Sequence, residues 1–203
     1  MSGYQLVYAP ASPFARKVVV TLIETGQRDA VELIATPGTP TEPDARRISV
    51  NPLGKIPALV RPDGPALYDS RVICRYLDQR GGGGLYPPGR LWEVLTLEAL
   101  SDGIMDAAVL MVYEHRCRAP GEISQTWLEA QWGKVTRALD AVEDRWMPHL
   151  AGQLTMAQIA LGCALGYLDF RHADRDWRTG RMALAEWERR FAERPAMQGT
   201  RPE

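Results

Sequence analysis

A run of four glycines, Gly81 to Gly84, is closely followed by the proline pair Pro87 and Pro88, and together they divide the sequence into two unlike parts. Consecutive glycines disfavour a continuing helix, and adjacent prolines cannot give N–H donors to a sheet, so the segment predicts a linker over 81–89. Short strand-forming runs precede it, whereas only helical periodicity follows it. The sequence therefore predicts an α/β domain over 1–80 and an all-helical domain over 90–203.

The first part has the pattern of a βαβ unit followed by a ββα unit. Its first strand is rich in strand formers, and Gly26 is a natural end for the helix that follows. Pro57 lacks an N–H donor, so it must begin the third strand or lie at an edge. The predicted elements are strand 5–8, helix 14–25, strand 31–35, a short irregular helix over 44–50, strands 58–60 and 66–68, and helix 71–80.

Apolar residues recur at helical spacing through the second part, which predicts helices over about 91–116, 128–146, 155–170 and 181–193. The first two should pack antiparallel. Thr155 and Gln158 have capping-box spacing, and the helix that they begin is apolar almost all round, as in the centre of a bundle. In the last helix we expect four side chains to face the core: Ala183, Leu184, Trp187 and Phe191.

Composition argues against several classes of function. The 24 basic and 25 acidic residues nearly balance, so no overall field attracts nucleic acid or a membrane surface. No apolar run approaches the roughly 18 residues that span a bilayer, and no signal-peptide pattern is present, so we expect a cytoplasmic protein. The three cysteines and three histidines have neither metal-ligand nor C-x-x-C spacing, which predicts no metal site and no redox pair.

Ser12 lies where a helix N-cap should lie, and Pro13 takes the first helical position. The hydroxyl would then lie beside unsatisfied backbone N–H groups at the positive end of a helix, where an anion is stabilised. If that anion is a thiolate, its pKa falls below the free-thiol value of about 8.5. The alternative is that Ser12 only caps the helix.

Three motifs occur in the first part: Ser12-Pro13-Phe14, Asn51-Pro-Leu-Gly-Lys-Ile-Pro57 and Tyr68-Asp69-Ser70-Arg71. Together they resemble the cytosolic glutathione S-transferase family, and most of all its serine-type bacterial and plant-like members. The resemblance covers nearly the whole chain and implies a thioredoxin-like N-terminal βαβ-ββα domain followed by an all-helical C-terminal bundle. The chain departs from the family at Gln158, where aspartate is usual.

The resemblance implies a role for each motif. Ser12 matches the catalytic position and would donate a hydrogen bond to the glutathione sulfur, favouring the thiolate. An implied cis Ile56–Pro57 bond would expose the Ile56 backbone to the cysteinyl segment. Asp69 and Ser70 would hold the γ-glutamyl ammonium and carboxylate, although each could equally be an ordinary cap. The implied glutathione-binding residues are Phe14, Lys55, Ile56, Pro57, Asp69 and Ser70, and the candidates for the electrophile pocket, expected in a cleft between the domains, are Met111 and Tyr113.

The function implied by this resemblance is that of a glutathione S-transferase acting in detoxification, as a homodimer. Glutathione would be a co-substrate, the second substrate a hydrophobic electrophile, and no bound cofactor would be needed. A non-catalytic binding or regulatory protein of the same fold is one alternative, and a glutathione-dependent thiol transferase or peroxidase is another. Thiol transfer needs a cysteine to form a mixed disulfide, and serine stands at position 12. The identity of the electrophile does not follow from the sequence.

Overall fold

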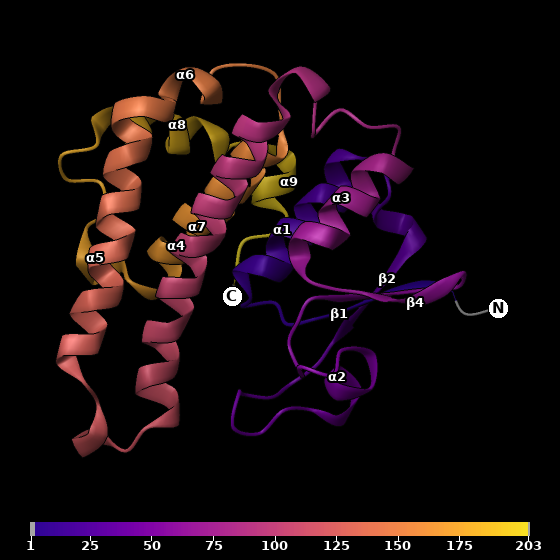
Figure 1. The fold of residues 1–203 in the computed structure, drawn as a ribbon, viewed down its shortest axis with the longest axis horizontal. Helices are drawn as coiled ribbons and strands as arrows, with labels where there is room; N and C mark the ends of the chain where they lie inside the picture. The colour runs from indigo at the N-terminus through magenta and orange to yellow at the C-terminus, as the bar shows by residue number, and fades with distance from the viewer. Residues whose placement is uncertain (1–2, 203) are drawn as a thin grey trace. The chain divides into compact units, whose positions relative to one another are not determined.

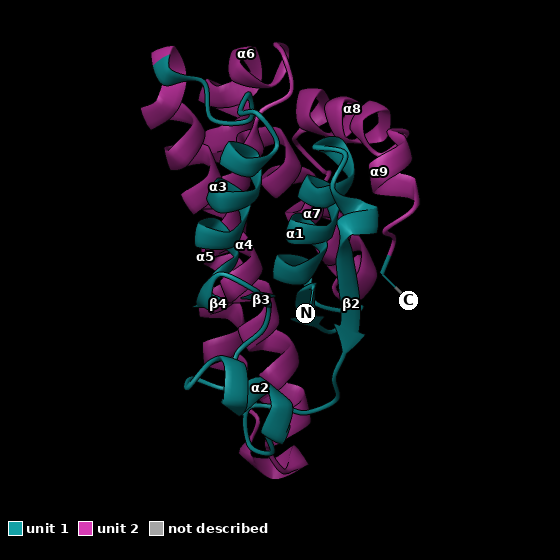
Figure 2. Ribbon diagram, turned by 90° about the vertical axis from the view of Figure 1, so that its right-hand side faces the viewer, with its two compact units in different colours: residues 1–88, 202–203 teal, residues 89–201 magenta. Residues whose placement is uncertain are grey.

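The computed structural model describes residues 3–202, so residues 1–2 and 203 of the two predicted domains lie outside the described range. The described chain divides into two compact units, coloured separately in Figure 2. The first unit runs to Pro88 and includes Pro202, and the second comprises Gly89–Arg201. The first contains the sheet, and the second is helical.

The sheet of the first unit is mixed and has four strands in the order β2-β1-β3-β4. Strand β1 is parallel to β2, and β3 is antiparallel to both of its neighbours. This topology confirms the predicted βαβ-ββα arrangement. The elements are β1 (Tyr4–Tyr8), α1 (Pro13–Glu24), a 3-10 turn (Arg28–Ala30), β2 (Val31–Ala35), α2 (Ala45–Val50), β3 (Ala58–Arg61), β4 (Gly64–Leu67) and α3 (Ser70–Arg80).

Helices α1 and α3 pack against one another on one side of this sheet, and α2 lies on the other side (Figure 1). Fully buried side chains from the sheet and from the two helices form the core. Each such aliphatic side chain contributes roughly 1.5–3 kcal/mol through burial. The core includes Leu6, Val18, Leu59, Ile73 and Leu77.

Local signals set most of these boundaries. Gly26 has φ +67°, a conformation that favours glycine, and helix α1 ends two residues before it. Strand β4 begins earlier than predicted because Gly64 pairs with Arg61 across a tight turn. The strand ends at Leu67, so Tyr68 lies outside it.

The second unit consists of helices joined by short turns. Helices α4 and α5 lie side by side and antiparallel, and α7 packs against α4 (Figure 1). Most side chains of α7 are buried, as predicted for a central helix. The elements are a 3-10 turn that begins in the linker (Pro88–Arg90), α4 (Leu91–Cys117), a 3-10 turn (Pro120–Glu122), α5 (Gln125–Ala141), a π-helical segment (Val142–Trp146), α6 (Met147–Leu150), α7 (Met156–Arg171), a 3-10 turn (Ala173–Arg175), α8 (Met182–Phe191) and α9 (Pro195–Gln198).

The second unit corrects two expectations. The predicted helix through Trp146 changes to π-helical geometry after Ala141, and Pro148, which cannot donate to the carbonyl four residues earlier, follows this segment. Ala183 is exposed rather than buried because the inward stripe of α8 consists of Leu184, Trp187 and Phe191. By contrast, the predicted capping box is confirmed, because the Thr155 backbone N–H donates to Gln158 Oε1 at 2.6 Å.

Between residues 3 and 202, none of the helices is both long enough and apolar enough to cross a bilayer.

Candidate functional site

Ser12 is the N-cap of α1, as its sequence position predicts. Ser12 Oγ accepts a hydrogen bond from the backbone N–H of Ala15 at 3.3 Å, and the Ser12 N–H donates to the Ala9 carbonyl at 3.0 Å. The side chain is half-buried, and Phe14 beside it in α1 is also half-buried. A hydroxyl carries one donor in addition to its acceptor sites, so the Ser12 O–H can still donate to a ligand.

The loop before β3 contains a cis peptide bond between Ile56 and Pro57, as the family resemblance implies. The Asn51 side chain makes two hydrogen bonds within this loop. Its Nδ2 donates to the Lys55 carbonyl at 2.9 Å, and its Oδ1 accepts from the Leu53 N–H at 3.1 Å. Within the described residues, no protein group forms a hydrogen bond with the Ile56 backbone. That backbone edge can therefore pair with an extended ligand.

Asp69 is the N-cap of α3, and its carboxylate accepts from the Arg71 N–H and from the Arg71 guanidinium, each at 3.0 Å. Ser70, the first residue of the helix, is only 2% exposed. The Tyr68–Asp69 peptide bond is also cis. This helix start presents a carboxylate and a hydroxyl together.

The Asp69 pKa is lowered. Burial would raise this pKa, but the Arg71 hydrogen bonds and charge, together with the charge of Lys17, outweigh burial. The Asp69 side chain is consequently an anion at neutral pH. Sequence reasoning does not predict that Lys17, a lysine on α1, is fully buried.

The register of the sheet brings these three features to the same end of the first unit. Val7 in β1 pairs with Ala58 in β3, so the chain that leaves β1 toward Ser12 begins where Pro57 leads into β3. Leu67, at the end of β4, pairs with Leu59 in the antiparallel strand β3. The segment from Tyr68 to Ser70 therefore also leaves the sheet at that end. Lys55 belongs to the same loop as Ile56, and its side chain is exposed.

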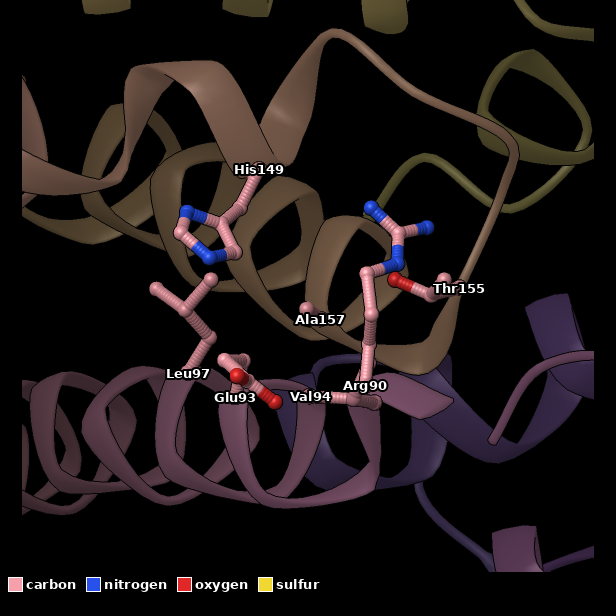
Figure 3. Close-up of a pocket in the computed structure, with 7 residues that line it drawn as sticks. All are labelled: Arg90, Glu93, Val94, Leu97, His149, Thr155 and Ala157. Carbon is pink, nitrogen blue, oxygen red and sulfur yellow. The ribbon is translucent and has the colours of Figure 1, made fainter. Parts of the chain in front are cut away.

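A shallow recess in the second unit lies between the start of α4, α6 and the start of α7 (Figure 3). In this view the Arg90 side chain extends toward the start of α7, and the His149 ring lies near Leu97. The recess contains neither predicted electrophile residue: Met111 is 3% exposed within the core of this unit, and Tyr113 is half-buried on α4. Its lining is Arg90, Glu93, Val94, Leu97, His149, Thr155 and Ala157.

Two family models match the chain. The model described as "Glutathione S-transferase, N-terminal domain" matches residues 11–80, and the one described as "Glutathione S-transferase, C-terminal domain" matches residues 125–190. The chain belongs to the glutathione S-transferase family. The N-terminal match includes every predicted glutathione-binding residue from Ser12 to Ser70.

Individual members of the glutathione S-transferase family are similar to this chain over nearly its full length. The "Uncharacterized GST-like protein YibF" of Escherichia coli K12 is 32% identical over 203 residues, which is 98% of each chain. A glutathione transferase family member from Pseudomonas fluorescens Pf-5, solved with bound glutathione, is 48% identical, with a TM-score of 0.96 and coverage of 98% of this chain and 99% of that one. A glutathione S-transferase from Methylobacillus flagellatus KT, solved with glutathione bound, is 35% identical, with a TM-score of 0.86 and coverage of 98% and 100%.

Proposed function

We propose that this chain is a glutathione transferase that activates the glutathione thiol as a thiolate for attack on hydrophobic electrophiles. The observation that carries the proposal is the presence of three features at one end of the sheet: the N-cap Ser12, the Ile56 backbone, to which no group in residues 3–202 is hydrogen-bonded, and the Asp69–Ser70 helix start. The similar proteins of P. fluorescens and M. flagellatus were solved with glutathione, which supports a glutathione site in this chain.

Ser12 is the proposed thiolate-stabilising residue. Its oxygen already accepts from Ala15 N–H, so the single hydroxyl proton is left to donate to the glutathione sulfur. The N-terminal end of the α1 dipole adds partial positive charge at the same place. Both interactions are stronger with the thiolate than with the thiol, so the pKa of the bound thiol falls and more nucleophile is present at neutral pH.

The rest of the glutathione molecule would be bound by backbone hydrogen bonds and by charged groups at the start of α3. Its cysteinyl segment would pair with the Ile56 N–H and carbonyl beside Pro57, as an added strand does. The ionised Asp69 would accept from the γ-glutamyl ammonium, while Ser70 and the first N–H groups of α3 would bind the carboxylate. Lys55 and Phe14 stay predicted contacts.

In the chemical step the thiolate lone pair forms a C–S bond to the electrophilic carbon. A leaving group then departs with its bonding electrons, or an unsaturated carbonyl compound takes up a proton after addition. The step needs neither a covalent enzyme intermediate nor a bound cofactor. Serine stands at position 12, and Cys74, the cysteine of the first unit, is fully buried, which favours conjugation over thiol transfer through a mixed disulfide.

The test is calorimetric binding of glutathione, combined with turnover of chlorodinitrobenzene by wild type and by Ser12→Ala. We expect Ser12→Ala to bind glutathione but to lose about 10²–10³-fold in kcat/KM, the usual effect of removing one such donor. Ser12→Thr retains a hydroxyl and should retain most of the activity.

A matched control separates catalysis from helix capping. Ser124 caps α5 in the same way, since its Oγ accepts from Trp127 N–H at 3.2 Å. Ser124→Ala should lose about 1 kcal/mol of stability, as any cap deletion does, without loss of activity. If wild type does not bind glutathione, the chain is a binding or regulatory protein of this fold and the proposal is wrong.

Other expectations stay predictions. These are the homodimer, which light scattering would detect, the cytoplasmic location, the role in detoxification and the electrophile contacts of Met111 and Tyr113. Turnover of an organic hydroperoxide in place of chlorodinitrobenzene would identify a peroxidase instead of a conjugating enzyme.

A further inference from the structure

Arg47 is a buried cation on the short helix α2. It is 6% exposed, whereas its neighbour Arg46 is exposed. The Arg47 guanidinium donates three hydrogen bonds: from Nε to Thr36 Oγ1 at 3.0 Å, from Nη2 to the Thr36 carbonyl at 2.7 Å, and from Nη1 to the Gly38 carbonyl at 3.3 Å. Its acceptors are thus two carbonyl groups and a hydroxyl of one segment, and the planar fork of arginine fits all three.

Thr36, which accepts from Arg47, is itself hydrogen-bonded to the end of β1. The Thr36 N–H donates to the Tyr8 carbonyl at 2.9 Å, and Thr36 Oγ1 donates to the same carbonyl at 3.2 Å. Tyr8 is the last residue of β1, and the turn that follows it ends at Ser12, whose N–H donates to the Ala9 carbonyl. Arg47 is therefore connected through Thr36 to Tyr8, the strand end at which the turn to Ser12 begins.

The backbone of Arg47 leads to the other half of the proposed site. The Arg47 carbonyl accepts from the Asn51 N–H at 2.9 Å, which closes the last turn of α2. Asn51 is 2% exposed, and its side chain holds the loop from Leu53 to Lys55 that leads into the cis Ile56–Pro57 bond. Arg47 thus contacts both the segment Thr36–Gly38, which is bonded to the end of β1, and Asn51, the first residue of the loop 51–57 (the Ile56 loop).

We propose that Arg47 is a positioning residue for glutathione binding: it sets the Ile56 loop against the strand end that precedes Ser12. This inference rests on the proposed function. Lysine at this position would keep the charge but could not donate in three fixed directions, and methionine would remove both the charge and the donors. Either change removes the guanidinium donors of the buried Thr36 carbonyl and of the Gly38 carbonyl, so α2 and the loop that follows it should shift relative to Thr36 and β1.

The test compares Arg47→Lys and Arg47→Met with the adjacent control Arg46→Gln, in steady-state kinetics with each substrate varied separately. We expect both Arg47 variants to raise the KM for glutathione about tenfold, equivalent to about 1.4 kcal/mol of lost binding. The KM for chlorodinitrobenzene should stay within about twofold, because the contact proposed for the Ile56 backbone is with glutathione. Arg46→Gln should match wild type, since its side-chain contact beyond α2 is a long one to Gln5 at 3.4 Å.

Two further measurements separate positioning from unfolding and from failure of the proposed function. Circular dichroism should show that the Arg47→Lys variant is folded, because a partly unfolded sample lowers the apparent kcat without raising one KM selectively. Calorimetry on wild type must first show that glutathione binds; absence of binding there would overturn the proposed function. A wild type that binds glutathione and a folded Arg47→Lys variant with an unchanged KM for glutathione would overturn the role of Arg47 alone.

Discussion

The guanidinium of Arg71 lies 3.0 Å from Asp69 Oδ2, and the Arg71 N–H donates to Asp69 Oδ1. Arg71 thus donates one hydrogen bond to each carboxylate oxygen of Asp69, which leaves further acceptor sites on both oxygens. Both side chains are 55% exposed, so solvent screens the pair and its net contribution to stability is about 0–1 kcal/mol. Its larger effect is on ionisation, because the Arg71 interactions and the Lys17 charge keep the Asp69 pKa low in spite of burial.

Arg71→Gln should raise the Asp69 pKa. The substitution removes the guanidinium while the effect of burial, which raises the pKa, persists. A lowered folded-state pKa gives stability that is present above the unfolded value of 3.8 and is lost as the pH falls through the folded value, so the variant should lose this contribution. Titration of the Asp69 carboxyl by carbon NMR measures the change directly, and an unaltered pKa would contradict this account.

His172 should make the second unit less stable in mild acid. Burial lowers the His172 pKa more than the hydrogen bond from its Nε2–H to the Ala108 carbonyl, 3.0 Å long, raises it. The unfolded chain therefore takes up a proton below the ordinary value of 6.5 before the folded chain does, and stability falls from there down to the lowered pKa.

Urea unfolding at several pH values measures this effect. The slope for one group is at most about 1.4 kcal/mol per pH unit, and it should shrink in His172→Gln, whose amide can still donate to Ala108. His115 is exposed on α4, and its charge is the smallest of the named influences on the His172 pKa, so His115→Gln should change the slope much less than His172→Gln. Equal slopes in wild type and His172→Gln would show that another group is responsible.

Gly162 lets α7 and α8 approach closely. A Cβ at this position would lie 2.6 Å from Phe191 Cδ1 and Cε1 and 3.2 Å from Met197 Cε. The Phe191 ring is stacked on Trp187 with centroids 4.8 Å apart, so it cannot move away freely. Gly162→Ala should therefore cost about 1–3 kcal/mol of unfolding free energy, despite the better helix propensity of alanine.

Gly103 is the control for that substitution. It lies in α4, and a Cβ there would meet no atom within 4 Å. Gly103→Ala should stabilise the protein by roughly 0.5–1 kcal/mol because alanine loses less backbone entropy on folding. Chemical denaturation of both variants gives the comparison, and a Gly162→Ala variant as stable as wild type would mean that α8 moves at little cost.

Local sequence signals predicted the parts of the site that depend on neighbouring residues. Ser12 and Asp69 are recognisable as caps because capping involves only the next few residues. The cis Ile56–Pro57 bond came from the family resemblance, since proline alone makes it uncommon. Buried cations could not be predicted in this way: what surrounds Lys17 and Arg47 is decided by segments distant in sequence, such as Thr36 and Gly38 for Arg47.

The same distinction applies to element boundaries. The inward stripe of α8 follows its neighbours in the fold, so periodicity alone placed Ala183 wrongly. Strand β4 starts at Gly64 because of a pairing with Arg61 that composition does not reveal.

Lys55 offers the sharpest test of how the glycyl end of glutathione is held. Its carbonyl accepts a hydrogen bond from Asn51, while its side chain is exposed, so the proposed contact with the glycyl carboxylate should not disturb the loop. An exposed charge pair is worth about 0.2–1 kcal/mol, so Lys55→Met should raise the KM for glutathione only about 1.4- to 5-fold, and less at high salt. With γ-glutamylcysteine, in which the glycyl carboxylate is missing, wild type and Lys55→Met should have the same KM.

Asn51→Ala removes the hydrogen bonds that Asn51 makes to the Lys55 carbonyl and to the Leu53 N–H. This variant should instead weaken the binding of glutathione and of γ-glutamylcysteine by the same factor. Equal losses for both thiols in Lys55→Met would show that Lys55 supports the loop and does not bind the glycyl carboxylate.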